Sequence, residues 1–72
     1  MRCVKPIQQR LGERIRMLRK TRGWSQEKLA EKANHHWTYI AGLERGERNP
    51  TLRVLADIAK ALDVPIRELL PE

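Results

Sequence analysis

Residues 25–46 read SQEKLAEKANHHWTYIAGLERG, and this stretch decides the fold of the chain. Ser25 is a favoured helix N-cap, because its hydroxyl can accept a hydrogen bond from a free amide of the first helical turn. Asn34 tolerates the left-handed backbone conformation that a tight turn demands. The stretch therefore predicts two short helices, at about residues 25–33 and 36–44, joined by a tight turn.

Apolar residues at helical spacing support both segments. Leu29, Ala30 and Ala33 form a narrow stripe on the first, and Ile40 and Leu43 form one on the second. Two short helices around a tight turn make a helix-turn-helix, a unit whose second helix can lie in the major groove of DNA.

A longer helix is predicted before this unit. Its apolar residues recur at spacings of four, four and three, which places them on one face of a helix from residue 7 to about residue 22. They are Ile7, Leu11, Ile15 and Leu18. Gly23 follows a basic last turn, as capping rules expect.

Two more helices are predicted after Gly46, which closes the second helix of the unit. The fourth begins near Thr51, with either Thr51 as its N-cap or Asn49 as the cap and Pro50 at the first helical position. Its apolar residues are Leu52, Leu55, Ile58, Ala59 and Leu62. Pro65 starts a short fifth helix, whose apolar residues are Ile66, Leu69 and Leu70. No strand-like alternation is found, so the expected fold is all-α: a compact five-helix bundle in a single domain, 1–72, with 1–6 as a short tail.

Composition restricts the partners. The 72 residues leave room for one small core. Fifteen Lys and Arg against nine Asp and Glu give a net charge of +6, which suits a polyanion such as nucleic acid or an anionic membrane surface. No apolar run approaches the length of a membrane span, and no signal-peptide core is found. The single Cys3 cannot form an internal disulfide, so we expect no role for it and a cytoplasmic location.

Patterns of catalytic and metal sites are not found in the sequence. It has no Gly-rich phosphate loop, no convergent carboxylate pair and no nucleophile beside a base. His35 and His36 are adjacent and therefore project in different directions, and no CxxC or HxxxH spacing accompanies them. We expect two solvated imidazoles in a turn, no enzyme activity, no metal, no cofactor and no small-molecule ligand.

Residues 11–70 resemble the Cro/repressor (XRE-like) helix-turn-helix family, which includes phage repressors and restriction–modification controller proteins. The motifs that carry the resemblance are Leu18-Arg19, Ser25-Gln26-x-x-Leu29-Ala30, Ile40, Leu43-Glu44-Arg45-Gly46, Arg48-Asn49-Pro50 and Ala59-x-x-Leu62 with Val64. The stretch 44–50 is most similar to the controller subgroup. The resemblance implies a fold of the lambda-repressor-like type and a transcriptional regulator, such as a repressor, that binds double-stranded DNA.

The resemblance also implies roles for individual residues. The base-facing positions are His36, Trp37, Thr38, Ala41 and Gly42. Helical geometry agrees, because Ile40 and Leu43 define the inward side and leave the positions at 37, 38, 41 and 42 pointing away. The phosphate-contacting positions are Gln26, Tyr39, Arg45, Arg48, Thr51, Arg10 and Arg14. Arg19 and Glu44 correspond to a partly buried ion pair that holds the scaffold.

A homodimer on a pseudo-palindromic operator is expected as well. One recognition helix reads only a few base pairs, whereas a twofold dimer reads two half-sites about 34 Å apart. The candidate interface lies in the last part of the chain, at Val64, Ile66, Leu69 and Leu70.

The predicted recognition surface departs from the usual pattern. No Arg, Gln, Asn or Lys lies between Trp37 and Leu43, although these types make the bidentate bonds to purines. Methyl contacts and DNA shape are therefore expected to carry more of the specificity. Gly42 costs about 1 kcal/mol in a helix relative to Ala, so it either permits a close approach or simply lacks a contact.

Three alternatives stay open. Trp37 can face the groove or pack sideways on the preceding helix. Tyr39 can reach a phosphate or pack its ring on the core. The whole domain can also serve as an antitoxin or adaptor that holds a protein partner with the same fold.

Overall fold

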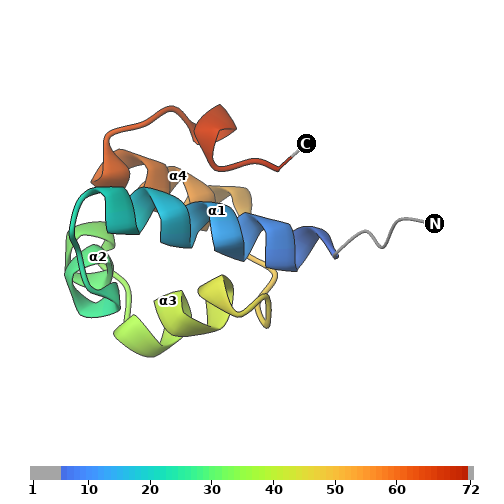
Figure 1. The fold of residues 1–72 in the computed structure, drawn as a ribbon, viewed down its shortest axis with the longest axis horizontal. Helices are drawn as coiled ribbons and strands as arrows, with labels where there is room; N and C mark the ends of the chain where they lie inside the picture. The colour runs from blue at the N-terminus through green and yellow to red at the C-terminus, as the bar shows by residue number, and fades with distance from the viewer. Residues whose placement is uncertain (1–5, 72) are drawn as a thin grey trace.

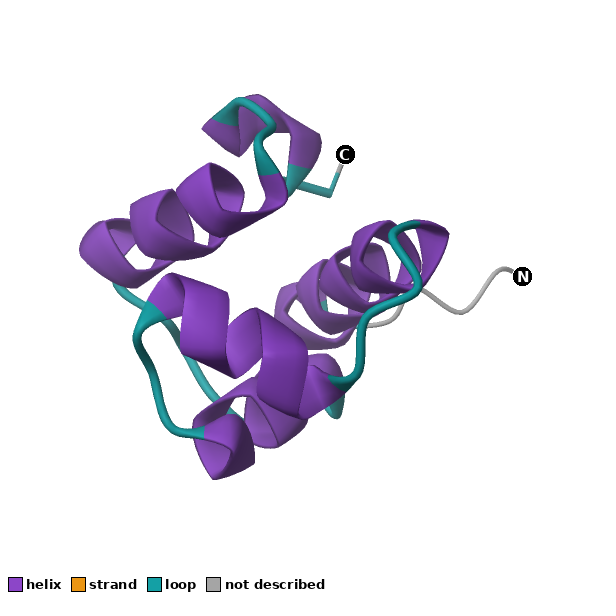
Figure 2. Cartoon of the chain, turned by 90° about the vertical axis from the view of Figure 1, so that its left-hand side faces the viewer, coloured by secondary structure: helices purple, strands orange, loops and turns teal. Residues whose placement is uncertain are grey.

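The computed structural model describes residues 6–71, which form four α-helices and one 3-10 turn (Figure 1). The elements are α1 (Ile7–Thr21), α2 (Gln26–Ala33), α3 (Trp37–Glu44), α4 (Leu52–Leu62) and η1 (Ile66–Glu68). Within these described residues no strand occurs, and Figure 2 shows only helices joined by short loops. The prediction of an all-α fold is confirmed.

The prediction of a fifth helix was wrong, because η1 is a single 3-10 turn. Only five residues separate Pro65 from Pro71, and a residue before proline is disfavoured in the helical conformation. The segment instead closes two short turns, in which the Glu68 amide donates to Pro65 O at 2.9 Å and the Leu69 amide donates to Ile66 O at 2.8 Å. A 3-10 turn of this length is the usual outcome where the chain cannot continue as a helix.

The predicted signals begin and end the helices. The Ser25 side chain accepts a hydrogen bond from the Lys28 amide at 3.1 Å at the start of α2. Asn34 ends α2 in the left-handed conformation, with φ 61°. Thr51, rather than Asn49, caps α4 by accepting from the Val54 amide at 3.2 Å.

The core is aliphatic and draws on every described helix. Its fully buried large side chains are Ile15, Leu29, Ile40, Leu43, Ile58, Leu62 and Leu69. The first residues of two predicted stripes lie outside it, since Ile7 is 62% exposed and Leu52 is 71% exposed. Both lie in the first turn of a helix, beyond the part that the neighbouring helices cover.

Gly12 lets α1 and α3 approach closely. A Cβ built at Gly12 would lie 2.6 Å from the carbonyl oxygen of Glu44 and closer still to that of Leu43. In Figure 1, α1 crosses the molecule between α3 and the C-terminal segment. Backbone contact at this glycine sets the distance at which α3 lies from α1.

Candidate nucleic-acid interface

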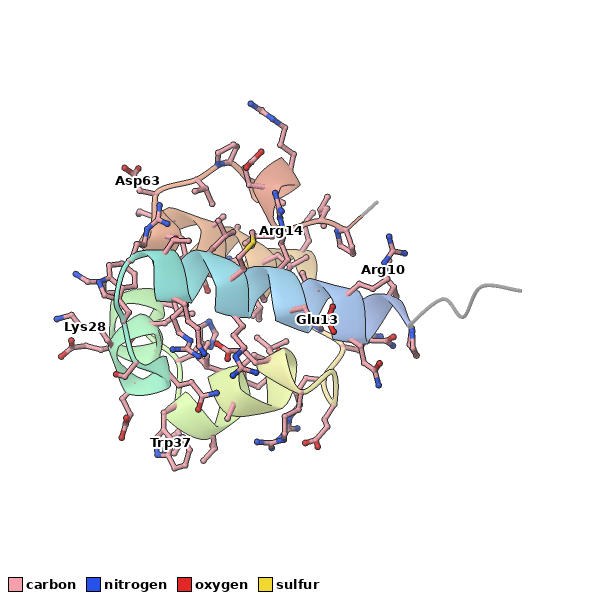
Figure 3. All side chains as sticks on the ribbon, in the orientation of Figure 1. Arg10, Glu13, Arg14, Lys28, Trp37 and Asp63 are labelled. Carbon is pink, nitrogen blue, oxygen red and sulfur yellow. The ribbon has the colours of Figure 1, made fainter. Side chains whose placement is uncertain are left out.

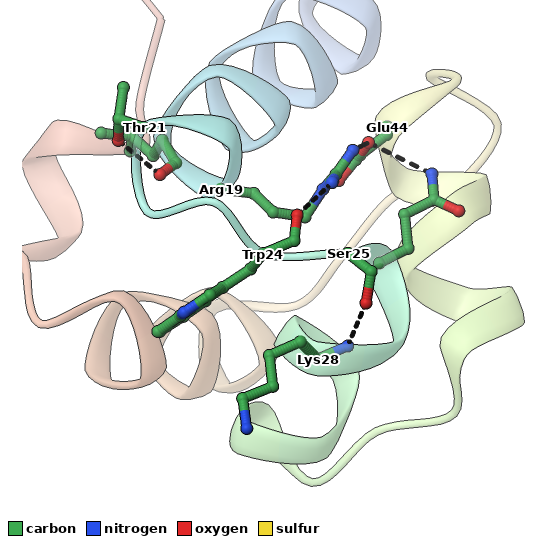
Figure 4. A network of polar contacts seen from close by, with 8 residues as sticks. Arg19, Thr21, Trp24, Ser25, Lys28 and Glu44 are labelled. Carbon is green, nitrogen blue, oxygen red and sulfur yellow. Dashed lines mark hydrogen bonds and ion pairs between the residues drawn. The ribbon is translucent and has the colours of Figure 1, made fainter.

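The C-terminal end of α3 is held by a buried ion pair with α1 (Figure 4). Arg19 donates from Nε to Oε2 of Glu44 at 2.6 Å and from Nη2 to Oε1 at 2.9 Å. The two side chains are 9% and 3% exposed. The hydrogen bond to Glu44 raises the pKa of Arg19 above its usual value, against the opposing effect of burial. This is the ion pair that the family resemblance implied.

Two further contacts extend the pair to the loop before α2 and to α2 itself. The third donor of Arg19, Nη1, reaches the carbonyl oxygen of Trp24 at 2.6 Å. The side-chain amide of Gln26 donates to Oε1 of Glu44 at 3.2 Å. Gln26 was predicted to contact a phosphate, and here it links the start of α2 to the end of α3. Glu44 therefore joins α1, α2 and α3 through one carboxylate.

The opposite end of α3 projects from the body of the protein. Trp37 is 47% exposed and is labelled at the lower edge of Figure 3. Its ring stacks on that of His36, with 6.2 Å between centroids and 27° between planes. Trp37 is not among the residues packed against the core. Trp37 is therefore exposed at the start of α3, and its contact with a groove stays a prediction.

His36 has a local role that the sequence analysis missed. It is the N-cap of α3, and its Nδ1 accepts a hydrogen bond from the Thr38 amide at 3.2 Å. The same nitrogen lies 2.7 Å from the Thr38 hydroxyl. His36 is exposed, as predicted for a solvated imidazole in a turn, and its Nδ1 in addition makes these contacts with Thr38. Thr38 itself is exposed.

Ala41 and Gly42 differ from the prediction of open, groove-facing positions. Ala41 is 4% exposed, and Gly42 is buried as well. The cover over Gly42 is the side chain of Arg48, whose Cγ lies 3.1 Å from a Cβ built on this glycine. The expected exposure was wrong at both positions, and at Gly42 the reason is that the Arg48 side chain from the following loop folds back over the helix.

Two arginines flank the end of α3. Arg45 donates to Glu47 at 3.0 Å in an exposed pair, and this hydrogen bond lowers the pKa of the Glu47 carboxyl below its usual value. The Arg48 guanidinium lies over the ring of Tyr39, 5.7 Å from its centroid. The Tyr39 ring is half-buried and packs against the core, which was one of its two alternatives.

Arg10 and Arg14 lie apart from this surface. In Figure 3 both are labelled above α1, whereas α3 lies below it. Arg14 is bound to the C-terminal segment, since its Nε donates to the carbonyl oxygen of Glu68 at 2.6 Å. Its Nη2 lies 3.6 Å from the Glu68 carboxylate. The structure does not gather these two arginines with the residues of α3.

His35 and Asp57 form a contact that no sequence pattern indicated. His35 Nε2 lies 3.1 Å from Oδ2 of Asp57 in α4, and the His35 ring stacks on Tyr39 at 5.7 Å. The His35 side chain is 24% exposed, so the prediction of a solvated imidazole was wrong. The partners are 22 residues apart in sequence, and neither follows a spacing that would single it out.

The predicted dimer residues divide by burial. Leu69 is fully buried in the core, so its assignment to an interface was wrong. Val64 and Ile66 are partly buried against the same core. Leu70 is 48% exposed. Leu69 is a core residue because the turn of η1 directs its side chain inward. The sequence alone did not distinguish Leu69 from its neighbour Leu70.

The described residues contain neither a metal-binding cluster nor a membrane-spanning helix. No group of three or more His, Cys, Asp or Glu side chains is placed to hold a metal ion within residues 6–71. No helix in that range is both long and apolar enough to cross a membrane. Cys3 lies outside the described residues.

Comparison with known proteins identifies relatives of this arrangement. Residues 15–69 match the helix-turn-helix family HTH_3. Control protein C.SmaI of Serratia marcescens is 44% identical over 68 residues, covering 94% of this chain and 81% of that protein. The HTH-type transcriptional regulator SinR of Bacillus subtilis is 38% identical over 63 residues, covering 86% of this chain and 57% of that protein.

A solved structure shares this fold over most of the chain. The restriction–modification controller protein C.AhdI from Aeromonas hydrophila superposes with a TM-score of 0.86 at 41% identity, covering 88% of this chain and 96% of that one. The relatives carry the names of transcriptional regulators and controller proteins, as the resemblance predicted. The chain belongs to the HTH_3 family of helix-turn-helix proteins.

Proposed function

We propose that this protein is a sequence-specific DNA-binding transcriptional regulator that acts as a small dimer on a pseudo-palindromic operator. The observation that carries the proposal is the placement of α3. Its C-terminal end is fixed by the Arg19–Glu44 pair, and its N-terminal end presents Trp37 and Thr38 outside the core. The major groove of B-DNA admits an α-helix in this manner, with the N-terminal residues of the helix at the base edges.

In this proposal Trp37 and Thr38 contact bases. Thr38 offers a hydroxyl and a methyl group, and the Trp37 indole offers one N–H and a large apolar face. Arg45 and Arg48, together with the free amides at the start of α4 beside Thr51, are the groups that contact the flanking phosphates in this proposal. Phosphate contact by Gln26, Tyr39, Arg10 and Arg14 stays a prediction.

The dimer interface in this proposal uses the end of the chain. Val64, Ile66 and the exposed Leu70 supply apolar surface there. Beside Leu70 a hollow is lined mainly by apolar groups, including those of Ile7 and Leu55. In such a dimer the two copies of α3 would need to lie about 34 Å apart to meet successive turns of the major groove.

The test measures binding of the protein to the DNA upstream of its own gene. Fluorescence anisotropy reports the binding, and unrelated duplex serves as competitor. Two subunits that neutralise about 6–10 phosphates should lose about 10³–10⁵ in affinity between 50 and 200 mM salt. Competitor-resistant binding by a dimer, measured by sedimentation, is the expected result. Binding equal to competitor, with little dependence on salt, would contradict the proposal and favour an adaptor that holds a protein.

A further inference from the structure

The N-terminal end of α3 is held by a contact separate from the Glu44 carboxylate. His35 comes two residues before the first residue of α3, in the turn that joins α2 to α3. Its Nε2 lies 3.1 Å from Oδ2 of Asp57, which belongs to α4. We propose that His35 is a positioning residue for DNA binding, which fixes this end of α3 against α4 and tightens the DNA complex when it is protonated. The inference rests on the proposed function, because it concerns the helix that would enter the groove.

One imidazole joins the two helices through two different contacts. The His35 ring stacks on the ring of Tyr39 in α3, with 5.7 Å between centroids and 27° between planes. A side-chain contact across the N-cap, from the residue before it to the first turn, fixes the angle at which the chain enters a helix. The bond to Asp57 fixes the same entry point relative to α4. The direction of the first turn of α3, which begins at Trp37, therefore depends on His35.

The bond to Asp57 is stronger when the imidazole is charged. A carboxylate can only accept hydrogen bonds, so Nε2 of His35 is the donor both in the neutral ring and in the imidazolium. With the imidazolium the bond joins two opposite charges, which makes it roughly twice as strong. The two side chains are 24% and 38% exposed, so water screens part of this gain. Histidine ordinarily changes charge between about pH 5 and 8, a range in which aspartate is ordinarily ionised.

The other charged groups near this contact are cations. Lys32 of α2 and Lys60 of α4 line the same hollow as Asp57. From α3 the facing ring is that of Tyr39, and the guanidinium of Arg48 lies 5.7 Å from its centroid. These cations oppose protonation of the imidazole, whereas the carboxylate favours it. The carboxylate lies within hydrogen-bond distance of the ring and Coulomb energy falls with distance, so acidification should strengthen the link.

The second imidazole of the turn acts in the opposite direction. Nδ1 of His36 accepts a hydrogen bond from the Thr38 amide at 3.2 Å, and a proton on that nitrogen would remove the acceptor. Acid therefore weakens the cap of α3 while it strengthens the bond of His35. Because both effects fall in the same range of pH, they are separated by comparing chains that all retain His36.

A positioning role and a simple effect of charge predict opposite results at Asp57. Removal of this carboxylate makes the protein more positive by one charge, which by electrostatics alone should strengthen binding to a polyanion. If the carboxylate anchors His35, its removal should instead weaken DNA binding, because the first turn of α3 is no longer fixed against α4. Asp57→Ala tests this, and alanine is the better helix former. Glu31→Ala is the matched control, since it removes a carboxylate from an exposed pair with Lys28.

The experiment is fluorescence anisotropy with the duplex from upstream of the protein's own gene, between about pH 6 and pH 8 at constant ionic strength. It compares the parent chain with His35→Gln, Asp57→Ala and Glu31→Ala, after melting curves have shown that each is folded. Glutamine keeps an N–H donor for Asp57 but cannot be protonated, so His35→Gln isolates the effect of the proton. Relative to this variant, the parent should gain about 2- to 5-fold in affinity as the pH is lowered over that range. Asp57→Ala should lose this gain and bind more weakly than Glu31→Ala.

Two results would overturn the inference and leave the proposed function standing. One is the same pH dependence of affinity in the parent and in His35→Gln. The other is an Asp57→Ala chain that binds DNA as tightly as Glu31→Ala or more tightly, which is the effect of charge alone. If Asp57→Ala does not fold, Asp57→Asn takes its place, because it keeps an acceptor of the same shape without the charge. A parent chain that binds the upstream duplex no better than competitor at every pH contradicts the proposed function, and this inference with it.

Discussion

Replacing Glu44 with alanine removes the one carboxylate that joins three helices. In the parent structure its two oxygens accept hydrogen bonds from Arg19 at 2.6 and 2.9 Å and from Gln26 at 3.2 Å. After the substitution the Arg19 guanidinium, 9% exposed, keeps only the carbonyl oxygen of Trp24 as a partner. A buried charge without its counter-ion has lost the hydration that an exposed arginine would retain.

The expected cost follows from these contacts. Breaking a buried pair by removing one partner typically costs about 3–5 kcal/mol. A domain of this size is expected to be stable by about 4–11 kcal/mol, so Glu44→Ala should remove a large part of the free energy of unfolding. At about 4–8 °C per kcal/mol for a small domain, the melting temperature should fall by about 12–40 °C.

Thermal unfolding followed by circular dichroism, with urea titration for the free energy, measures the effect. The matched control is Glu31→Ala in α2, which removes a carboxylate from an exposed pair with Lys28 and should cost about 0.5 kcal/mol or less. The double variant Arg19→Met/Glu44→Leu removes both charges and should be more stable than Glu44→Ala alone. If Glu44→Ala unfolds within 1 kcal/mol of the Glu31 control, the argument from buried charge is refuted.

Three other predictions concern single positions. Gly12→Ala places a methyl 2.6 Å from the carbonyl oxygen of Glu44 and should lower the free energy of unfolding by about 1–3 kcal/mol in urea titration; equal stability would show that α1 and α3 can separate freely. Ser25→Ala removes the N-cap of α2 and should cost about 0.5–2 kcal/mol by the same measurement, a loss that would be absent if the cap did not form. Arg45 holds the pKa of Glu47 low, so the contribution of this pair to stability is present at neutral pH and is lost as the pH falls through that lowered pKa. In an NMR titration Arg45→Ala should raise the midpoint of the Glu47 carboxyl, and an unchanged midpoint would exclude the contact.

The local features of the fold could be predicted from the sequence because their causes are local. The Ser25 cap and the left-handed Asn34 depend on residues within one or two turns, so the local sequence was sufficient to predict them. The Arg19–Glu44 pair, 25 residues apart, was anticipated only through resemblance to a family. The prediction of a fifth helix was wrong because Pro65 and Pro71 limit the segment to one turn. The spacing of its apolar residues did not show this limit.

The site was predicted less fully, because its decisive contacts join separate parts of the chain. From the sequence, Gly12 is only a poor helix former, and its purpose is visible once the backbone of α3 lies against it. Gly42 was predicted to lie open on α3, and the loop residue that covers it could not be foreseen from helical geometry alone. His35 and Asp57 meet only because α4 packs beside the turn before α3.

The shared carboxylate of Glu44 also reduces the conformational entropy that the protein loses when it binds DNA. Because α3 is tied to α1 and α2 in the free protein, its backbone freedom is given up during folding. A duplex that meets this protein would have to immobilise only a few outer side chains, such as those of Trp37 and Thr38. Association should then proceed as the docking of two rigid bodies, and alteration of the outer side chains should change which DNA is chosen while leaving the framework intact.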